Sequence, residues 1–224
     1  MGLNGKGSFV PFTRRPLFKG VKLHVVGMKG NVIESVINTT DIKYMDGDRR
    51  DGSTLVILNS SGSLHVKDRM ADAANQWGQR ENIVKYKRVN DDSDLLLEVV
   101  LRVDDITSID VSTKDMFTVL VKTPFGVFPV VGKHDKIVDR ASYCRPFATF
   151  NKIVEKDGKR HLLPAALPVD TILGVEASYA DNSTLVRTEI GRMPVAESVD
   201  QAMEIIDREA KAFEEALAAI EAGQ

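Results

Sequence analysis

The sequence lacks the features on which disulfide-rich and membrane-spanning proteins depend. Its 224 residues include a single cysteine, Cys144, so no disulfide can form within the chain and cysteines cannot complete a zinc site. No apolar run approaches the roughly 20 residues that cross a bilayer. The basic N-terminus has no continuous apolar core of the kind that secretory signals carry. We therefore expect a protein without a membrane partner that is synthesised in the cytoplasm.

Residue patterns that carry catalysis or ligand binding are also scarce. The glycines within 2–7 do not precede a predicted strand and helix, so they do not predict a phosphate-binding loop. The aspartates within 46–51 resemble a calcium loop, but two arginines interrupt them and no suitable glutamate follows, which favours a charged, solvated hairpin. The four histidines lie far apart without metal-ligand spacing: His24, His65, His134 and His161. The sequence therefore predicts a non-enzymatic protein with no metal ion and no cofactor.

Acidic residues are missing from the N-terminal end, and basic residues are few at the C-terminal end. Residues 1–33 contain six basic and no acidic side chains, while residues 34–224 together carry a net charge of −8. The last predicted helix, over 197–222, has eight acidic and two basic residues. The two ends therefore favour partners of opposite charge.

What the sequence does contain is one pattern of about 65 residues written three times. In each copy an isoleucine is followed 20, 20 or 19 positions later by a glycine: Ile42 and Gly62, Ile106 and Gly126, Ile172 and Gly191. A small repeated unit exposes a face that only a neighbouring copy can cover. The repetition therefore favours a function in assembly over one in catalysis.

Alternating apolar residues and β-formers predict five strands in the first copy, over 21–25, 32–36, 42–45, 54–58 and 63–66. Asp68 is expected to cap a helix that carries Met70, Ala74 and Trp77 on one face. The same order can be followed in the other two copies. We predict an α+β, β-dominated fold of three tandem β-β-β-β-β-α repeats with a long C-terminal helix. The expected divisions are an arm (1–17), repeats over 18–80, 81–144 and 145–211, and an extension of the last helix (212–224).

Glycine and proline recur at matched positions of the last hairpin in each copy. Gly62, Gly126 and Gly191 are expected to have positive φ, which glycine adopts easily because it has no Cβ. Pro129 and Pro194 occupy equivalent positions, and proline cannot donate a ladder hydrogen bond. We therefore expect an edge strand or a bulge at each proline.

The first copy also resembles a known small unit. Its turn at Lys29-Gly30-Asn31, the step Ile37-Asn38 to Ile42, the strand Thr54–Leu58, the turn at Gly62 and the final helix follow the order of the FlbD-type flagellar unit. The same pattern resembles the opening half of LytTR DNA-binding domains. This resemblance implies a β-rich shape for each unit and implies no catalytic residue.

The C-terminal helix is predicted by a capping box, Ser198 with Gln201, and by an apolar seam. The seam recurs at alternating spacings of four and three: Val199, Met203, Ile206, Ala210, Phe213, Leu217 and Ile220. One interpretation is a helix that lies across the sheet of its own chain. The other is a helix that packs against another subunit, with Met203, Ile206, Phe213, Leu217 and Ile220 as its interface. The period alone does not separate them.

The N-terminal arm is rich in glycine and has basic and aromatic residues interleaved. Such a composition predicts no structure of its own. Aromatic side chains between charges suit docking into grooves of a protein partner. The residues expected to bind a partner are Lys6, Phe9, Phe12, Arg14, Arg15, Phe18, Lys19 and Lys22.

Two hypotheses of function follow from these features. The first is a structural or assembly protein that binds itself, as a homo-oligomer, or other structural proteins. It would belong to a larger assembly such as a bacteriophage virion, as a decoration, tail or connector component. The alternative is a regulatory module that binds nucleic acid through the basic arm, or a host protein. The body has an acidic net charge and no helix rich in Arg or Lys, which disfavours nucleic acid.

Overall fold

The computed structural model describes residues 19–47, 53–60, 62–90, 93–115, 117–178 and 183–223. Arm residues up to Phe18 lie outside these ranges. The chain contains fifteen strands and three α-helices in the described part, and five strands precede each helix. The fold is therefore β-dominated and ends in a long helix, as the sequence predicts.

The elements fall into three consecutive groups, which we call blocks. The N-terminal block has β1 (Gly20–Val26), β2 (Val32–Asn38), β3 (Ile42–Gly47), β4 (Thr54–Leu58), β5 (Gly62–Val66) and α1 (Met70–Gly78). The middle block has β6 (Ile83–Asn90), β7 (Ser93–Arg102), β8 (Ser108–Val111), β9 (Thr118–Thr123), β10 (Gly126–Val131) and α2 (His134–Ser142). The C-terminal block has β11 (Phe147–Lys156), β12 (Lys159–Pro168), β13 (Ile172–Ala177), β14 (Thr184–Thr188), β15 (Gly191–Val195) and α3 (Val199–Glu221). A 3-10 turn joins the second and third strands of each block: η1 (Thr39–Asp41), η2 (Val103–Asp105) and η3 (Val169–Thr171).

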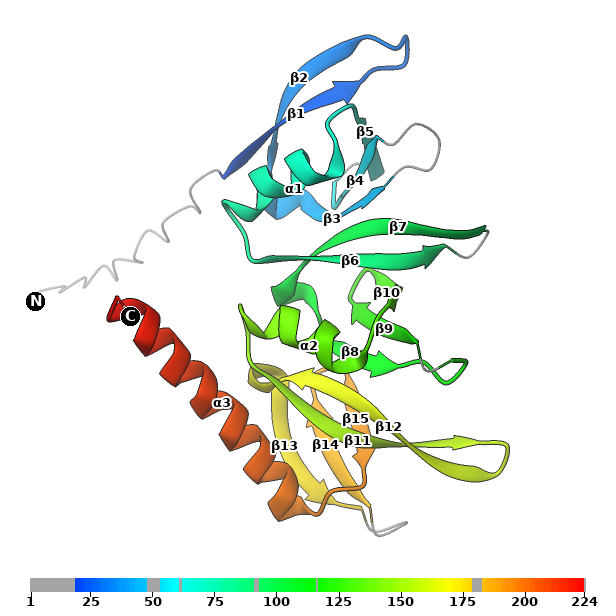
Figure 1. Cartoon of the computed structure of the whole chain (residues 1–224), viewed down its shortest axis with the longest axis vertical. Coiled ribbons are helices and arrows are strands. Elements are labelled where there is room, and N and C mark those ends of the chain that lie inside the picture. Colours follow the sequence, from blue (N-terminus) through cyan, green and yellow to red (C-terminus); the bar gives the residue numbers. More distant parts are fainter. Residues whose placement is uncertain are drawn as a thin grey trace, which may run out of the picture.

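All strands join one antiparallel sheet, and the three blocks follow one another along the long axis of the molecule (Figure 1). The strand order is β13-β14-β15-β11-β12-β8-β9-β10-β6-β7-β3-β4-β5-β1-β2. Within each block the order is third, fourth, fifth, first, second. The blocks meet where β12 pairs with β8 and where β7 pairs with β3. The second strand of one block thus joins the third strand of the block before it in sequence.

Three hydrophobic cores correspond to the three blocks, and two of them contain side chains from the next block. Val100 on β7 lies in the core of the N-terminal block, whereas its neighbours Val99 and Leu101 lie in the core of their own block. On β12, Ala166 lies in the middle core, whereas Ala165 and Leu167 lie in the C-terminal core. Alternate residues of a strand point to opposite faces, so these two strands serve two cores at once.

The hairpin glycines behave as the sequence predicts, with φ of 82° at Gly62, 150° at Gly126 and 148° at Gly191. The helix α3 begins with the expected capping box, in which Gln201 N donates to Ser198 Oγ and Ser198 N donates to Gln201 Oε1. These turns and this helix start are therefore encoded locally.

Other expectations were wrong in detail. Asp68 does not cap α1, whose N-cap is Arg69 without a side-chain cap bond; instead Asp68 Oδ2 accepts from the His24 amide at 2.6 Å. Strand β10, which carries Pro129, is not at an edge, because it lies between β9 and β6. It registers with β6 at one pair only, Val130 with Arg88, which suits a strand whose proline has no N–H to donate.

Candidate assembly surfaces

The two junctions between blocks use the same register. At the first, Asp46 on β3 lies opposite Val99 and Met45 lies opposite Val100. At the second, Asp110 on β8 lies opposite Ala165 and Ile109 lies opposite Ala166. Asp46 and Asp110 occupy equivalent positions, because each pairs with a leucine on the following strand, Leu55 and Leu120 respectively. The two junctions therefore pair equivalent residues in the same register.

A partly buried ion pair crosses each junction at the same place. Arg88 on β6 donates to both carboxylate oxygens of Asp46, with Nε–Oδ1 at 3.0 Å and Nη2–Oδ2 at 2.5 Å. Lys152 on β11 donates to Asp110 Oδ2 at 2.9 Å. Arg88 and Lys152 are equivalent, because each lies opposite a valine of the fifth strand in its block. Both pairs join residues 42 positions apart in the chain.

Asp110 has a second cation within its own block, because Lys122 Nζ lies 2.6 Å from the same carboxylate oxygen. The side chain of Asp110 is 7% exposed. Burial by itself raises the pKa of a carboxyl group, but the hydrogen bonds and charges of Lys122 and Lys152 outweigh it and lower the pKa of Asp110 below its ordinary value. The carboxylate is thus charged wherever the protein is folded near neutral pH.

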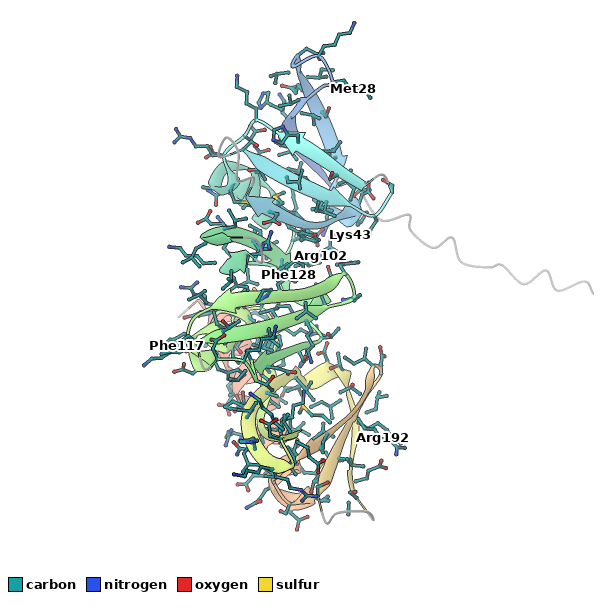
Figure 2. The ribbon with its side chains drawn as sticks, turned by 90° about the vertical axis from the view of Figure 1, so that its right-hand side faces the viewer. Met28, Lys43, Arg102, Phe117, Phe128 and Arg192 are labelled. Carbon is teal, nitrogen blue, oxygen red and sulfur yellow. The ribbon has the colours of Figure 1, made fainter. Side chains whose placement is uncertain are left out.

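An arginine also holds the 3-10 turn of the preceding block at each junction. Arg102 Nη2 donates to the carbonyls of Thr39 at 2.7 Å and Ile42 at 3.2 Å, and its guanidinium lies 5.9 Å from the ring centre of Trp77. Figure 2 shows Arg102 at the level where the N-terminal and middle blocks meet. Charge-assisted hydrogen bonds of this kind are about twice as strong as neutral ones.

At the second junction Arg145 holds the 3-10 turn of the middle block. Its Nη1 donates to the carbonyls of Asp104 at 3.0 Å and Ile106 at 3.2 Å, and its Nε lies 2.8 Å from Asp170 Oδ1. Arg102 and Arg145 do not occupy equivalent positions in their blocks. Arginines at non-equivalent positions therefore make similar contacts at the two junctions.

The two ends of the sheet present the strands that the junctions use, without a neighbouring strand in the described part of the chain. These are the outer edge of β2 and the outer edge of β13. Val36 on β2 occupies the position of Val100 and Ala166, since each lies two residues before the residue that caps the following 3-10 turn. Val100 and Ala166 are fully buried, whereas Val36 is 58% exposed.

Further apolar side chains are exposed on the hairpin that contains β2. Val32 and Ile33 are exposed on β2, and Met28 at the hairpin tip is fully exposed. Figure 2 shows Met28 at the far end of this hairpin, pointing away from the body. Val32 and Val36 lie on the same face of β2, because alternate residues of a strand share a face, and exposed apolar patches are typical of interaction sites.

The C-terminal helix packs on its own chain over the first part of its length, and the apolar residues of its last turns are exposed. Ile206 packs on the core of the C-terminal block. Phe213 is half-buried in a groove that also contains Cys144 and Arg145, so α3 runs alongside the second junction (Figure 1). Leu217 and Ile220 beyond it are 44% and 71% exposed.

Met203 is exposed as well, because the buried side of the helix start passes through Ala202. The seam predicted from the spacing therefore runs from the chain's own core, at Ile206, onto an exposed surface.

Of the predicted arm residues, the structure describes only Lys19 and Lys22. Lys22 Nζ forms an ion pair with Glu34 Oε2 at 2.7 Å, and Lys19 Nζ lies 3.6 Å from Glu81 Oε1. Both side chains are more than half exposed, so these pairs contribute little stability. Lys6, Phe9, Phe12, Arg14, Arg15 and Phe18 lie outside the described residues.

The residues that join the blocks were missed by the sequence analysis. Asp46 was assigned to a solvated hairpin, yet it lies on β3 with its side chain 13% exposed and paired with Arg88. The signal that could have identified it is the repeated separation from an acid to a base, Asp46 to Arg88 and Asp110 to Lys152. Local sequence patterns do not indicate which residues pair when the two lie so far apart in the chain.

Comparisons with protein-family models, with curated proteins and with solved structures gave no match. Within the described ranges, His, Cys, Asp and Glu side chains form no group of three or more that could hold a metal ion. None of the described helices is long and apolar enough to cross a membrane.

Proposed function

We propose that the protein is a non-enzymatic structural or assembly component, built of three tandem units, that binds itself or other structural proteins. The observation that carries this proposal is the exposed end of α3, where Leu217 and Ile220 form an apolar continuation of a seam that is covered at Ile206. An acidic helix with such a stripe suits docking on a complementary helix or groove. The basic arm supplies the opposite charge for a neighbouring molecule.

The three-unit interpretation is supported by the identical junction registers and by the equivalent ion pairs. A particle component of bacteriophage type, such as a decoration, tail or connector protein, is the setting that we propose. Head-to-tail contact between an acidic helix and a basic arm would weaken as salt screens the charges.

Light scattering tests this proposal on the full chain. We expect a defined oligomer at low salt whose mass falls in the variant Leu217→Glu/Ile220→Glu and in the variant Arg14→Ala/Arg15→Ala. The matched control is Ala218→Glu, which adds a charge at an exposed position of the same helix turn. Equal masses for all four proteins would contradict assembly through the arm and helix. A salt-dependent complex with duplex DNA, lost in the arginine variant, would favour the nucleic-acid alternative.

A further inference from the structure

We propose that the two open ends of the sheet bind each other between molecules, so that β13 of one copy pairs with β2 of a second copy in the register of the internal junctions. This inference rests on the proposed assembly function and names its partner, a second copy of this chain. The expected pairs are Val175 with Val36 and Glu176 with Ser35. Their internal counterparts are Met45 with Val100 and Asp46 with Val99.

The sheet stops at each end with a strand of the kind that pairs at the internal junctions. The order begins at β13, a third strand, and finishes at β2, a second strand. Third and second strands are the ones that pair at both internal junctions, β3 with β7 and β8 with β12. The ends of one molecule are therefore complementary to each other, and a second copy continues the same sheet.

The three cores differ in what they receive from a following block. The N-terminal and middle cores each receive a side chain from the second strand of the next block, Val100 and Ala166. The C-terminal core contains no such side chain among its described members. Val36, the equivalent residue on β2, is 58% exposed and lies in no core. Pairing β2 with β13 of another copy would place Val36 in the core that lacks this contribution.

Strand β13 is less buried than its counterparts β3 and β8. Met45 and Ile109 on β3 and β8 are fully buried, whereas Val175 at the same position of β13 is half-buried. The same difference separates Ile42 and Ile106 from Ile172. The residues that the internal junctions bury are thus exposed at β2, at Val36, and only partly buried at β13.

The helix packing leaves this edge accessible. The start of α3 packs against β13 in the way that α1 packs against β3 and α2 packs against β8. Those two helices do not prevent β3 and β8 from pairing with the next block. The arrangement of the C-terminal block is therefore compatible with a strand added beside β13.

Two differences from the internal junctions determine how strongly two molecules are expected to associate through β13 and β2. At the position of Arg88 and Lys152 the N-terminal block has Val25, so Glu176 would meet no base across the junction. Ile83 on β6 and Phe147 on β11 each pack on the core of the preceding block. The equivalent residue of the N-terminal block is Gly20 on β1. The contact between molecules is therefore weaker than the internal junctions and rests on backbone hydrogen bonds and apolar contacts. We expect reversible association that persists when salt is raised.

A register-specific disulfide tests the pairing directly. Two single-cysteine proteins are prepared in the full chain with Cys144→Ser, one with Val36→Cys and the other with Val175→Cys. Cα atoms directly opposite in antiparallel strands are about 4.5–5.5 Å apart, which is the range that a disulfide spans. On oxidation of the mixture we expect a dimer that contains one of each protein. The control replaces Val36→Cys by Val32→Cys, since the residues equivalent to Val32 stay 51% and 56% exposed at the internal junctions.

Sedimentation of uncross-linked variants gives the second measurement. Val36→Lys should weaken self-association about tenfold or more, because it places a charge where a core receives an apolar side chain. Val32→Lys should leave self-association unchanged. Val25→Arg should strengthen it about threefold by supplying the missing base opposite Glu176.

The outcomes separate this inference from the proposed function. Self-association that survives Val36→Lys but is lost in Leu217→Glu/Ile220→Glu would overturn the sheet junction and leave assembly through the helix intact. Self-association that is lost in Val36→Lys but retained in Leu217→Glu/Ile220→Glu would support the sheet junction and contradict the role proposed for the helix. Equal cross-linking of Val36→Cys and Val32→Cys with Val175→Cys, or a full chain that stays monomeric at high concentration, would overturn the sheet junction.

Discussion

The fold shifts the pKa values of two aspartates of the middle block, Asp110 and Asp105, in opposite directions. Asp110 accepts hydrogen bonds from Lys122 and Lys152, and the pKa of its carboxyl is lowered although burial alone would raise it. Asp105 lies 3.6 Å from Arg102 across Nη1–Oδ2, and burial raises its pKa more than that arginine lowers it. The first aspartate therefore stabilises the folded state when charged, whereas the second is more favourable when neutral.

We expect Asp110→Asn to reduce the free energy of unfolding at pH 7 by about 1–3 kcal/mol, because it leaves two lysines facing each other at the second junction. The lowered pKa means that this contribution is present above the ordinary value of 3.8 and is lost as the pH falls through the pKa of the folded protein. The unfolding energy of the variant should therefore depend less on pH in the acid range. Urea unfolding at a series of pH values measures both effects.

Asp105→Asn is the matched control. Because the pKa of Asp105 is raised, its contribution is favourable at low pH and is lost as the pH rises through that pKa. The variant should thus be no less stable than the parent protein at pH 7. A loss of stability at pH 7 equal to that of Asp110→Asn would contradict these assignments.

At the scale of elements, the hairpin glycines separate into two kinds. Gly62 has a φ of 82°, close to the left-handed region that other residues reach at a cost of roughly 1–2 kcal/mol. Gly191 has a φ of 148°, far from any region that L-residues favour. A Cβ at either position would meet no atom within 4 Å, so the backbone conformation alone decides the cost.

Gly191→Ala should therefore destabilise the protein more than Gly62→Ala does, by roughly 1–3 kcal/mol against about 1 kcal/mol. Urea midpoints of the two variants give the comparison, and Gly27 is no control because a Cβ there would lie 2.6 Å from Asn31 Oδ1. Ser63→Ala, at an exposed strand position, serves instead. Equal costs for the two glycines would show that neighbouring turns relax to accommodate alanine.

Local patterns predicted most elements because the information for a strand, a glycine turn or a capped helix lies within a few residues. Ser198 with Gln201 and the three hairpin glycines are of this kind. The cap expected at Asp68 does not form because its carboxylate accepts instead from the amide of His24, 44 residues away. The edge assigned at Pro129 was wrong because the fold places β10 inside the sheet and reduces its pairing with β6 instead.

The candidate surfaces were less predictable than the elements. The period of α3 predicted an apolar seam but left open what covers it, and the buried position of Ala202 did not follow from the period. The junction pairs Asp46 with Arg88 and Asp110 with Lys152 depend on which strands become neighbours, and strand order is not written in any one segment. Whether the chain is related to FlbD-type or LytTR units stays a prediction.

For the whole molecule, the shared cores mean that no block is independent of the next. Val100 belongs to the middle block by its strand and to the N-terminal block by its packing. Val100→Ala should therefore lower the free energy of unfolding by about 2 kcal/mol and reduce the amide protection of β4 and β5 before that of β9. Hydrogen exchange resolves this difference.

The control is Val119→Ala, a buried position whose packing lies within the middle core. It should reduce protection in the middle block first. If both variants lost protection uniformly across all three blocks, the chain would unfold as one unit and the cores would not be separable.

The strand order also gives the molecule a direction. One end finishes in β13 and the other in β2, and the two are not interchangeable. A pair of molecules related by a twofold axis would bring like ends together, which is not the pairing that the internal junctions show. Any row built by the sheet is therefore polar, with one kind of end at its head and the other at its tail, as in filaments that grow differently at their two ends.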